Sequence, residues 1–361
     1  MNNKEIKISP IQFLFLALTL VFRDFHIMNP SRFAKQDAWI AFLMGMFLGL
    51  IMISIYLLIA KLHPGKNLVE ILLDSFGKYI GFVFSIIYIW FFIHLSTLIL
   101  RAFSEYMVII NYFETPQYFI IITLMLALIY ILRRGFEVIA RISELFVPIL
   151  ILFVLLLFFI LTNKFNYNFL LPILKDGVIS IMDTIFMISN FPFGGLIILL
   201  MIFPYLNERN KMVKYTYWSV FIGSLLMLMI IFRDLLVLGP NILSNVVFPP
   251  NISTSLIQTT VLEPFISMNL LITVAGFLSL SIHSTIVAIG TLFKLEEEKP
   301  LIIPVVLIII GISLWQFDNI SEIFSFLTEV YPYYSFAFQG IIPLLILIIS
   351  YIKRKSQRGF N

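Results

Sequence analysis

Ten apolar runs cover most of the chain, and their lengths limit the folds that it can adopt. They lie at roughly 8–30, 38–60, 79–110, 118–132, 144–162, 178–205, 215–238, 265–293, 301–317 and 332–352. A helix of about 20 apolar residues crosses the ~30 Å hydrocarbon core of a bilayer. Hydrophobic residues make up 60% of the sequence and charged residues 12%, so little chain remains for a soluble domain. We therefore predict an all-α integral membrane protein in which residues 1–361 form one polytopic domain.

Lys and Arg residues are distributed unevenly between the two sides of this predicted domain. If the N-terminus is cytoplasmic, the inner loops and tails carry 17 of these residues and the outer loops carry four. Cytoplasmic loops of membrane proteins have such an excess. The distribution therefore supports ten transmembrane helices with both termini in the cytoplasm. The remaining three basic residues, Arg23, Arg101 and Arg233, fall within the predicted spans.

The first apolar run contains ionisable residues. Its apolar part, 11–22, would extend only ~18 Å as a helix, so the span must continue through Arg23, Asp24 and His26. Ionisable side chains at that depth are costly and usually mark a site inside the protein. These residues could instead line a water-filled vestibule, or Arg23 could pair with an acidic residue. In the functional alternative, Arg23 holds a substrate carboxylate, because its planar fork of donors matches that group.

The sixth run has a second interruption. It consists of Asn190, Phe191, Pro192, Phe193, Gly194 and Gly195. Proline removes a hydrogen-bond donor and glycine tolerates unusual backbone angles, so an unwound segment is expected there. The alternative is a simple proline kink, which membrane helices tolerate. We favour a broken helix, because interruptions in the first helix of each half of a chain indicate a midplane binding site in transporters. Repeats of about 8–162 and 178–352 would then make up the domain.

Two charged pairs and one aromatic cluster have structural interpretations. Arg101 and Glu105 are one helical turn apart, which predicts a structural ion pair on the third helix. Arg233 and Asp234, near the outer end of the seventh helix, are expected to form a solvated pair. The aromatic cluster 331–334 is expected to form a belt at the membrane interface.

Polar residues in the third and eighth helices are candidates for the same pocket. His94, Leu95 and Thr97 lie near the middle of the third helix. Ser279 and His283 of the eighth helix could contact a ligand, or could serve helix packing as small polar residues often do in membranes. A proton relay from the first-helix ionisable residues to His94 is a further alternative.

Several function classes find no support in the sequence. The absence of Cys excludes a disulfide framework and a thiol nucleophile. The intramembrane histidines lack the spacing of metal ligands, so no metal site is expected. No nucleophile–base constellation, phosphate loop or pair of catalytic carboxylates lies on one element, so neither an enzyme nor a cofactor is expected. The net charge of +4 comes from short loops, where membrane topology explains it, so nucleic acid is not an expected partner.

A set of short stretches resembles one known family. In chain order they are 8–12, 36–40, 63–70, Arg101 with Glu105, 135–148, 171–177, Phe203-Pro204 and Leu238-Gly239-Pro240. The stretch 135–148, Gly-Phe-Glu-Val-Ile-Ala-Arg-Ile-Ser-Glu-Leu-Phe-Val-Pro, is the most specific. Their order and spacing resemble the B-subunit permease of spore germinant receptors. That family is the endospore germination branch of the amino acid/polyamine/organocation transporter superfamily.

This resemblance implies a leucine-transporter-like fold of two inverted five-helix repeats, with helices one and six broken. It also implies a pocket formed by helices one, three, six and eight, assembly with A-type and C-type receptor subunits, and a place in the inner spore membrane. Together with the polar positions above, it gives a predicted set of ligand-binding residues. They are Arg23, Asp24, Phe25, His26, His94, Leu95, Thr97, Asn190, Phe191, Phe193, Gly194, Gly195, Ser279 and His283.

The chain departs from the family pattern at the pocket. Arg23 and Phe25 stand where the family has glycines in the first-helix break. No acidic residue follows Gly194 and Gly195, where the family usually has a glutamate. The outer loop reads Leu-Glu-Pro-Phe at 262–265, without the arginine expected before the eighth helix. The identity of the ligand therefore does not carry over from the family.

Three functional hypotheses follow. The first is a nutrient-sensing subunit of a spore germination receptor, which binds an amino acid or similar small germinant at the breaks of helices one and six. The second is a secondary transporter of amino acids or related solutes, coupled to protons or sodium. The third is a scaffold or ion-conduction component whose pocket has degenerated. Uptake separates the second from the others, and ligand binding separates the first from the third.

Overall fold

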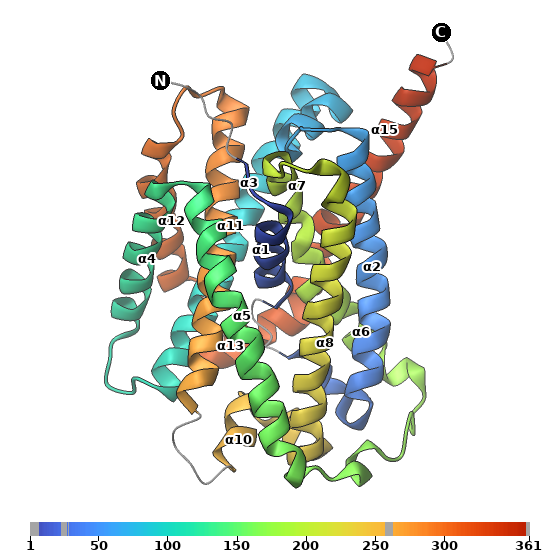
Figure 1. The fold of residues 1–361 in the computed structure, drawn as a ribbon, viewed down its shortest axis with the longest axis vertical. Coiled ribbons are helices and arrows are strands. Elements are labelled where there is room, and N and C mark those ends of the chain that lie inside the picture. The colour runs from blue at the N-terminus through green and yellow to red at the C-terminus, as the bar shows by residue number, and fades with distance from the viewer. Residues whose placement is uncertain (1–6, 23–26, 28, 257–262, 359–361) are drawn as a thin grey trace.

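The computed structural model describes residues 7–22, 27, 29–256 and 263–358. Every named element within these ranges is a helix. Eight of the helices are long and apolar enough to cross a membrane, and two shorter apolar helices, Pro10–Phe22 and Lys299–Trp315, complete the set. Each of the ten predicted apolar runs is therefore represented by a helix, and the all-α membrane architecture is confirmed. The described chain begins and ends at the same end of the molecule (Figure 1).

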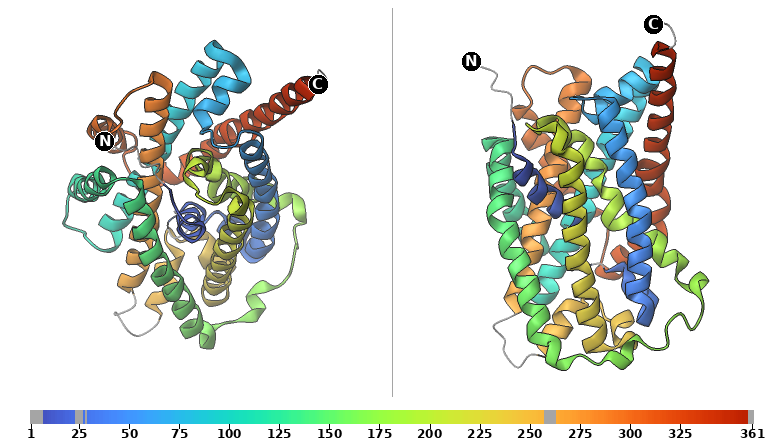
Figure 2. Two further views of the ribbon diagram at one scale, coloured as in Figure 1. Left: turned by 45° about the horizontal axis from the view of Figure 1, so that its top comes forward. Right: turned by 45° about the vertical axis from the view of Figure 1, so that its right-hand side comes forward.

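The first half of the chain places its shortest α-helix at the centre of the bundle. Its elements are α1 (Pro10–Phe22), η1 (Pro30–Asp37), α2 (Ala38–Leu62), α3 (Leu68–Ile110), α4 (Gln117–Arg134) and α5 (Phe136–Leu161). Helix α1 is surrounded by longer helices (Figure 2) and packs against α5, α8 (Met212–Leu238) and α11 (Glu263–Phe293). Nine of its 13 residues are buried, so most of α1 is shielded from lipid.

The third helix begins earlier than the sequence pattern indicated. The apolar run starts at residue 79, whereas α3 starts at Leu68. Its first turn is fixed by a capping box, in which Asn67 Oδ1 accepts from the Glu70 amide at 3.0 Å and Glu70 Oε2 accepts from the Asn67 amide at 2.8 Å. Gly77, at φ 80°, then kinks the helix, a conformation that glycine adopts without steric cost. Glu70, Asp74 and Lys78 interrupt the apolar residues of the first turns, so a prediction based on hydrophobicity did not include these turns.

The second half of the chain is divided into shorter pieces. A connection with short turns, η2 (Thr162–Lys164), η3 (Tyr167–Leu170) and η4 (Val178–Ile181), leads into α6 (Met182–Ile188). Helix six continues through η5 (Ser189–Phe193), η6 (Gly194–Ile198), α7 (Leu199–Ile202) and η7 (Phe203–Tyr205), and η8 (Arg209–Lys211) precedes α8. After α11 come η9 (Lys299–Leu301) and α12 (Ile302–Trp315). The last helix consists of α13 (Ile320–Ser325), η10 (Phe326–Val330), α14 (Tyr331–Phe336), η11 (Ala337–Ile341) and α15 (Ile342–Arg358).

The connection after α8 forms a helical cap at the end opposite the described chain ends (Figure 1). It contains α9 (Pro240–Asn245) and α10 (Pro249–Ser255). Arg32, in η1, donates to the carbonyl oxygens of Val246 at 2.5 Å and Val247 at 3.0 Å. The Tyr106 hydroxyl of α3 lies 3.2 Å from Asn251 Oδ1 in α10. The cap is thus bonded to both η1 and α3.

The pair Arg233–Asp234 is buried beneath this cap, and the prediction of a solvated pair is wrong. The two side chains are 2% and 0% exposed, and Arg233 Nη2 lies 2.7 Å from Asp234 Oδ1. The Ser253 hydroxyl of α10 donates to the same carboxylate oxygen at 2.6 Å. The position of the pair near the end of α8 suggested that water would reach it. Helix α10 folds back over this end, so the pair is shielded from water.

Candidate ligand-binding site

Helix six changes its helix type where the sequence predicted a break. The α-helix α6 ends at Ile188, η5 is a π-helix, and η6 is a 3-10 helix. The interruption therefore remains helical, whereas the prediction was an unwound segment. We refer to residues Ser189–Ile198 as the helix-six interruption. All ten of its residues are buried, and it contacts α1 and α2.

Two glycines of α2 let helix six approach closely, one at the end of α6 and one at the helix-six interruption. A Cβ atom on Gly45 would lie 2.6 Å from Ile188, and one on Gly49 would lie 2.5 Å from Phe193. Glycines four residues apart line one helix face and permit close contact between membrane helices. This spacing is visible in the sequence and predicts a close helix contact by α2, although it does not identify helix six as the partner.

A second contact joins the helix-six interruption to the last helix. A Cβ atom on Gly194 would lie 2.6 Å from Gln339 Cδ. The Tyr56 hydroxyl donates to the carbonyl oxygens of Gln339 at 2.5 Å and of Gly194 at 3.3 Å. Gln339 Nε2 in turn donates to the Tyr331 hydroxyl at 3.0 Å. Helix α2, helix six and the last helix therefore meet at one hydrogen-bonded cluster.

Asn190 is the most polar side chain of the helix-six interruption, and it retains an unused acceptor. It is 0% exposed, and its Nδ2 donates to the Phe186 carbonyl oxygen at 2.9 Å. Its Oδ1 atom is buried without a hydrogen-bond partner among the residues of the described ranges. A buried acceptor without a partner costs free energy that a ligand donor could recover.

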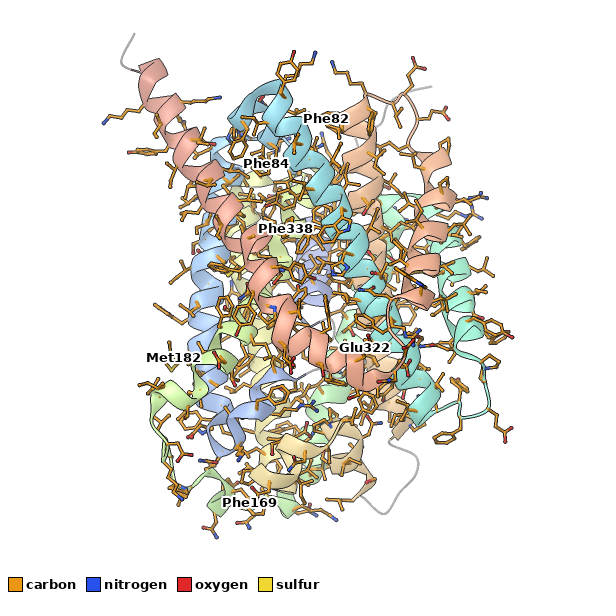
Figure 3. The ribbon with its side chains drawn as sticks, turned by 180° about the vertical axis from the view of Figure 1, so that it is seen from behind. Phe82, Phe84, Phe169, Met182, Glu322 and Phe338 are labelled. Atoms are coloured by element: carbon orange, nitrogen blue, oxygen red, sulfur yellow. The ribbon has the colours of Figure 1, made fainter. Side chains whose placement is uncertain are left out.

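The predicted third-helix residues face the last two helices. A hydrogen bond of 2.5 Å joins His94 Nε2 and the Tyr334 hydroxyl. The Thr97 hydroxyl donates to Gln316 Oε1 at 3.0 Å, after the end of α12. Leu95 is 1% exposed. Figure 3 shows Phe338 of the last helix beside α3, where its ring stacks on Phe91 at 4.5 Å.

Tyr331 and Tyr334 were missed as candidate residues, because an aromatic belt explained their sequence cluster. Tyr331 is 1% exposed, whereas Tyr333 is 61% exposed, so the belt prediction is wrong for Tyr331. The Tyr331 ring lies 5.5 Å from Phe191 and 5.6 Å from Tyr334. These two tyrosines connect the helix-six interruption to His94. Sequence pattern alone does not tell a buried tyrosine from an interfacial one.

The predicted eighth-helix residues form a separate group between α11 and α5. Ser279 lines an apolar cavity of about 250 Å³ that Thr19 of α1 also lines, and its hydroxyl donates to the Ala275 carbonyl oxygen at 2.7 Å. The His283 ring stacks on Phe136 with centroids 4.6 Å apart. His283 Nε2 has no hydrogen-bond partner in the described part of the chain.

Arg101 and Glu105 connect α3 to two neighbouring helices. Arg101 Nη2 lies 2.7 Å from Glu105 Oε1. The same carboxylate oxygen accepts from Gln117 of α4 at 3.1 Å. Arg101 Nη1 lies 3.5 Å from the Ser313 carbonyl oxygen of α12. These contacts are those of a structural ion pair.

The first-helix candidates Arg23, Asp24, Phe25 and His26 lie outside the described residues. Within the described ranges, no group of three or more His, Asp or Glu side chains could hold a metal ion.

Sequence comparison gives the family of the chain. The model of the family described as "Spore germination protein" matches residues 7–321. The chain belongs to the spore germination protein family. Spore germination protein KB of Bacillus subtilis is 30% identical over 340 residues, which cover 91% of this chain and 90% of that protein. Spore germination protein A2 of the same organism is 25% identical over 334 residues, covering 88% and 87% of the two chains.

The fold of this spore germination family member is that of a leucine-transporter-type protein. The crystal structure of MhsT in complex with L-phenylalanine matches with a TM-score of 0.61 at 14% identity, and the match covers 96% of this chain and 99% of that one. MhsT is a transporter of the leucine-transporter fold, so the predicted fold class is confirmed.

Proposed function

We propose that this protein is the nutrient-sensing subunit of a spore germination receptor. An amino acid or similar zwitterion binds where helix one meets the helix-six interruption, and binding shifts the protein between two conformations. The shift requires a difference in the ligand's affinity for the two conformations. A-type and C-type receptor subunits detect the shift in the inner spore membrane, with both termini of this chain on the core side. The protein catalyses no reaction.

The buried helix-six interruption is the observation that supports this proposal. It combines a π-helix and a 3-10 helix, and such departures from α geometry occur frequently at functional sites. Asn190 Oδ1, which has no hydrogen-bond partner among the described residues, offers an acceptor for a ligand ammonium group. The similarity to spore germination proteins over most of the chain supports a role in germination.

A secondary transporter coupled to protons or sodium is the second candidate. The observation that favours it is the match to MhsT over nearly the whole chain. The two functions are separated by reconstituting the purified protein in liposomes with a panel of labelled amino acids. Binding without accumulation supports the sensor. Concentrative uptake driven by a proton or sodium gradient supports the transporter, and absence of both contradicts the two proposals together.

Arg23 gives the first prediction for ligand choice. Arg23→Gly restores the family's residue at this position, and we expect a changed order of affinities within the amino-acid panel. The reason is that a guanidinium holds a carboxylate through two hydrogen bonds, which a glycine cannot supply. The measurement is equilibrium binding of each amino acid to the purified protein. An unchanged order of affinities would remove Arg23 from the site.

Asn190 gives a prediction that separates binding from stability. Asn190→Leu removes an acceptor that is unpaired within the described ranges, so we expect about tenfold weaker ligand binding from the loss of one hydrogen bond to a charged group. The melting temperature should change little, because the lost Nδ2 donor bonds the Phe186 carbonyl oxygen, which keeps the Ser189 hydroxyl as a donor. Ser189→Ala in the same π-helix is the matched control. The Ser189 hydroxyl donates to the Phe186 carbonyl oxygen at 2.7 Å and lies 3.5 Å from Asn190 Nδ2, so this variant leaves the Asn190 Oδ1 acceptor in place. Equal binding by Asn190→Leu and the native protein would contradict the role.

A further inference from the structure

Two adjoining cavities lie at the end of α2, on the predicted cytoplasmic side and away from the helix-six interruption. Both are lined by Lys61, His63, Pro64 and Lys66. The larger, of about 600 Å³, extends to Lys353 and Arg354 of α15. The smaller, of about 390 Å³, extends to Arg209 of η8.

The walls of these cavities carry an excess of positive charge. Their lining contains five lysine and arginine side chains and one carboxylate, that of Asp74. Asp74 already has partners, because its carboxylate pairs with Lys66 and its carbonyl oxygen accepts from Lys353 Nζ at 2.8 Å. The side chains of Lys61, Arg209 and Arg354 have no ion-pair or hydrogen-bond partner within the described ranges. Three cations are therefore available to an anion.

The larger cavity is held together by contacts between its walls. His63 Nε2 and the Ser350 hydroxyl are 2.8 Å apart, and the Ser75 and Ser350 hydroxyls are 3.3 Å apart. These contacts tie the α2–α3 loop and the start of α3 to α15. A cavity with fixed walls binds its ligand with a smaller ordering cost than a set of free surface lysines.

The two helices that carry Lys61 and Arg354 also carry exposed apolar side chains near the same ends. Ile348, Tyr351 and Ile352 of α15 are 46%, 65% and 61% exposed, and Leu58 of α2 is 47% exposed. The end of α15 projects away from the bundle (Figures 1 and 2). A phospholipid offers both the anionic group and the acyl chains that such a surface contacts, whereas a soluble phosphate offers only the first.

We propose that the larger cavity, between the α2–α3 loop and α15, binds the phosphate headgroup of an anionic phospholipid. Lys61 and Arg354 contact the phosphate oxygens, and the apolar face of α15 contacts the acyl chains. This assignment does not depend on the nutrient site, and it would hold for a sensor or for a transporter.

The test uses the full-length protein in detergent, titrated with dioleoyl phosphatidylglycerol and, separately, with dioleoyl phosphatidylcholine and inorganic phosphate. Native mass spectrometry counts the bound lipids. One cation near an anionic lipid contributes roughly a fivefold gain in affinity, so K61Q/R354Q is expected to bind phosphatidylglycerol roughly 30-fold more weakly. The matched control is R133Q/K299Q, which removes two exposed cations that do not line these cavities.

The expected result is tight binding of phosphatidylglycerol by the native protein and the control, and weak binding by K61Q/R354Q. Equal weakening in both double variants would overturn the proposal, because diffuse surface charge would then explain the binding. Displacement of phosphatidylglycerol by inorganic phosphate at equal concentration would also overturn it, because the site would then recognise free phosphate.

Discussion

Arg233→Leu is expected to lower the free energy of unfolding by about 3–5 kcal/mol, because it leaves the Asp234 carboxylate buried without its counter-charge. Asp234 is 0% exposed, so water cannot replace the guanidinium. The remaining partner, the Ser253 hydroxyl at 2.6 Å, is neutral. The measurement is the apparent melting temperature of the purified protein in detergent, which should fall by about 10 °C.

Two further variants show whether burial causes this effect. R233L/D234L removes both charges and should recover most of the lost stability, since apolar replacement of a whole buried pair is often neutral. The pair Lys211–Glu208 has the same N–O distance of 2.7 Å but is 43% and 45% exposed. Lys211→Leu should therefore leave the melting temperature unchanged. A small effect of Arg233→Leu, equal to that of Lys211→Leu, would contradict the buried pair.

Gly194→Ala is expected to destabilise the protein by about 1–3 kcal/mol, the usual cost of adding a methyl group to a packed core. The new Cβ would lie 2.6 Å from Gln339 Cδ, so the side chain of Gln339 must move. Gln339 is 0% exposed and has little space in which to do so. The measurement is again the melting temperature, together with amino-acid binding.

A double-mutant cycle tests whether Gln339 is the cause. Gln339→Ala leaves only the Cβ atom, 3.2 Å from the new methyl group, so G194A/Q339A should be more stable than the sum of the single effects by about 1 kcal/mol. Gly311→Ala in α12 is the matched control, because a Cβ there meets no atom within 4 Å. It should stabilise slightly, since alanine favours a helix over glycine. Additive single effects would contradict a direct clash between helix six and the last helix.

Local chemistry explains which features were predictable from the sequence. The number of helices follows from the apolar runs and from the side on which Lys and Arg gather. The helix-six interruption follows from Pro192 and Gly194, whose backbone effects act within a few residues. The close contact with α2 also has a local signal, the spacing of Gly45 and Gly49. Proline and glycine do not determine whether the chain unwinds at this point or adopts the π and 3-10 turns that the structure shows.

Features that depend on distant partners were not predictable. Arg233 and Asp234 are buried because α10 folds over them. The sequence of their own helix does not indicate that another helix covers its end. His94 was placed in a pocket by its depth in the membrane, yet its partner is Tyr334, 240 residues away. Tyr331 and Tyr333 are two positions apart and have opposite exposure. Such differences are set by which helices are neighbours, and a single sequence does not give that information.

The π-helical turns of the last helix have a geometric consequence. A π turn holds one residue more than an α turn, so side chains after it are rotated by about 100° from the continuation of the preceding helix. The last helix has two such turns, η10 and η11, and so behaves as three rods with different angular offsets. Deleting one residue within Phe326–Val330 would turn everything beyond it by about 100° and carry Gln339 away from Gly194. The packing of the last helix against helix six thus depends on the number of residues in its π turns. Adding or removing a single residue there would rotate the contacting side chains out of place.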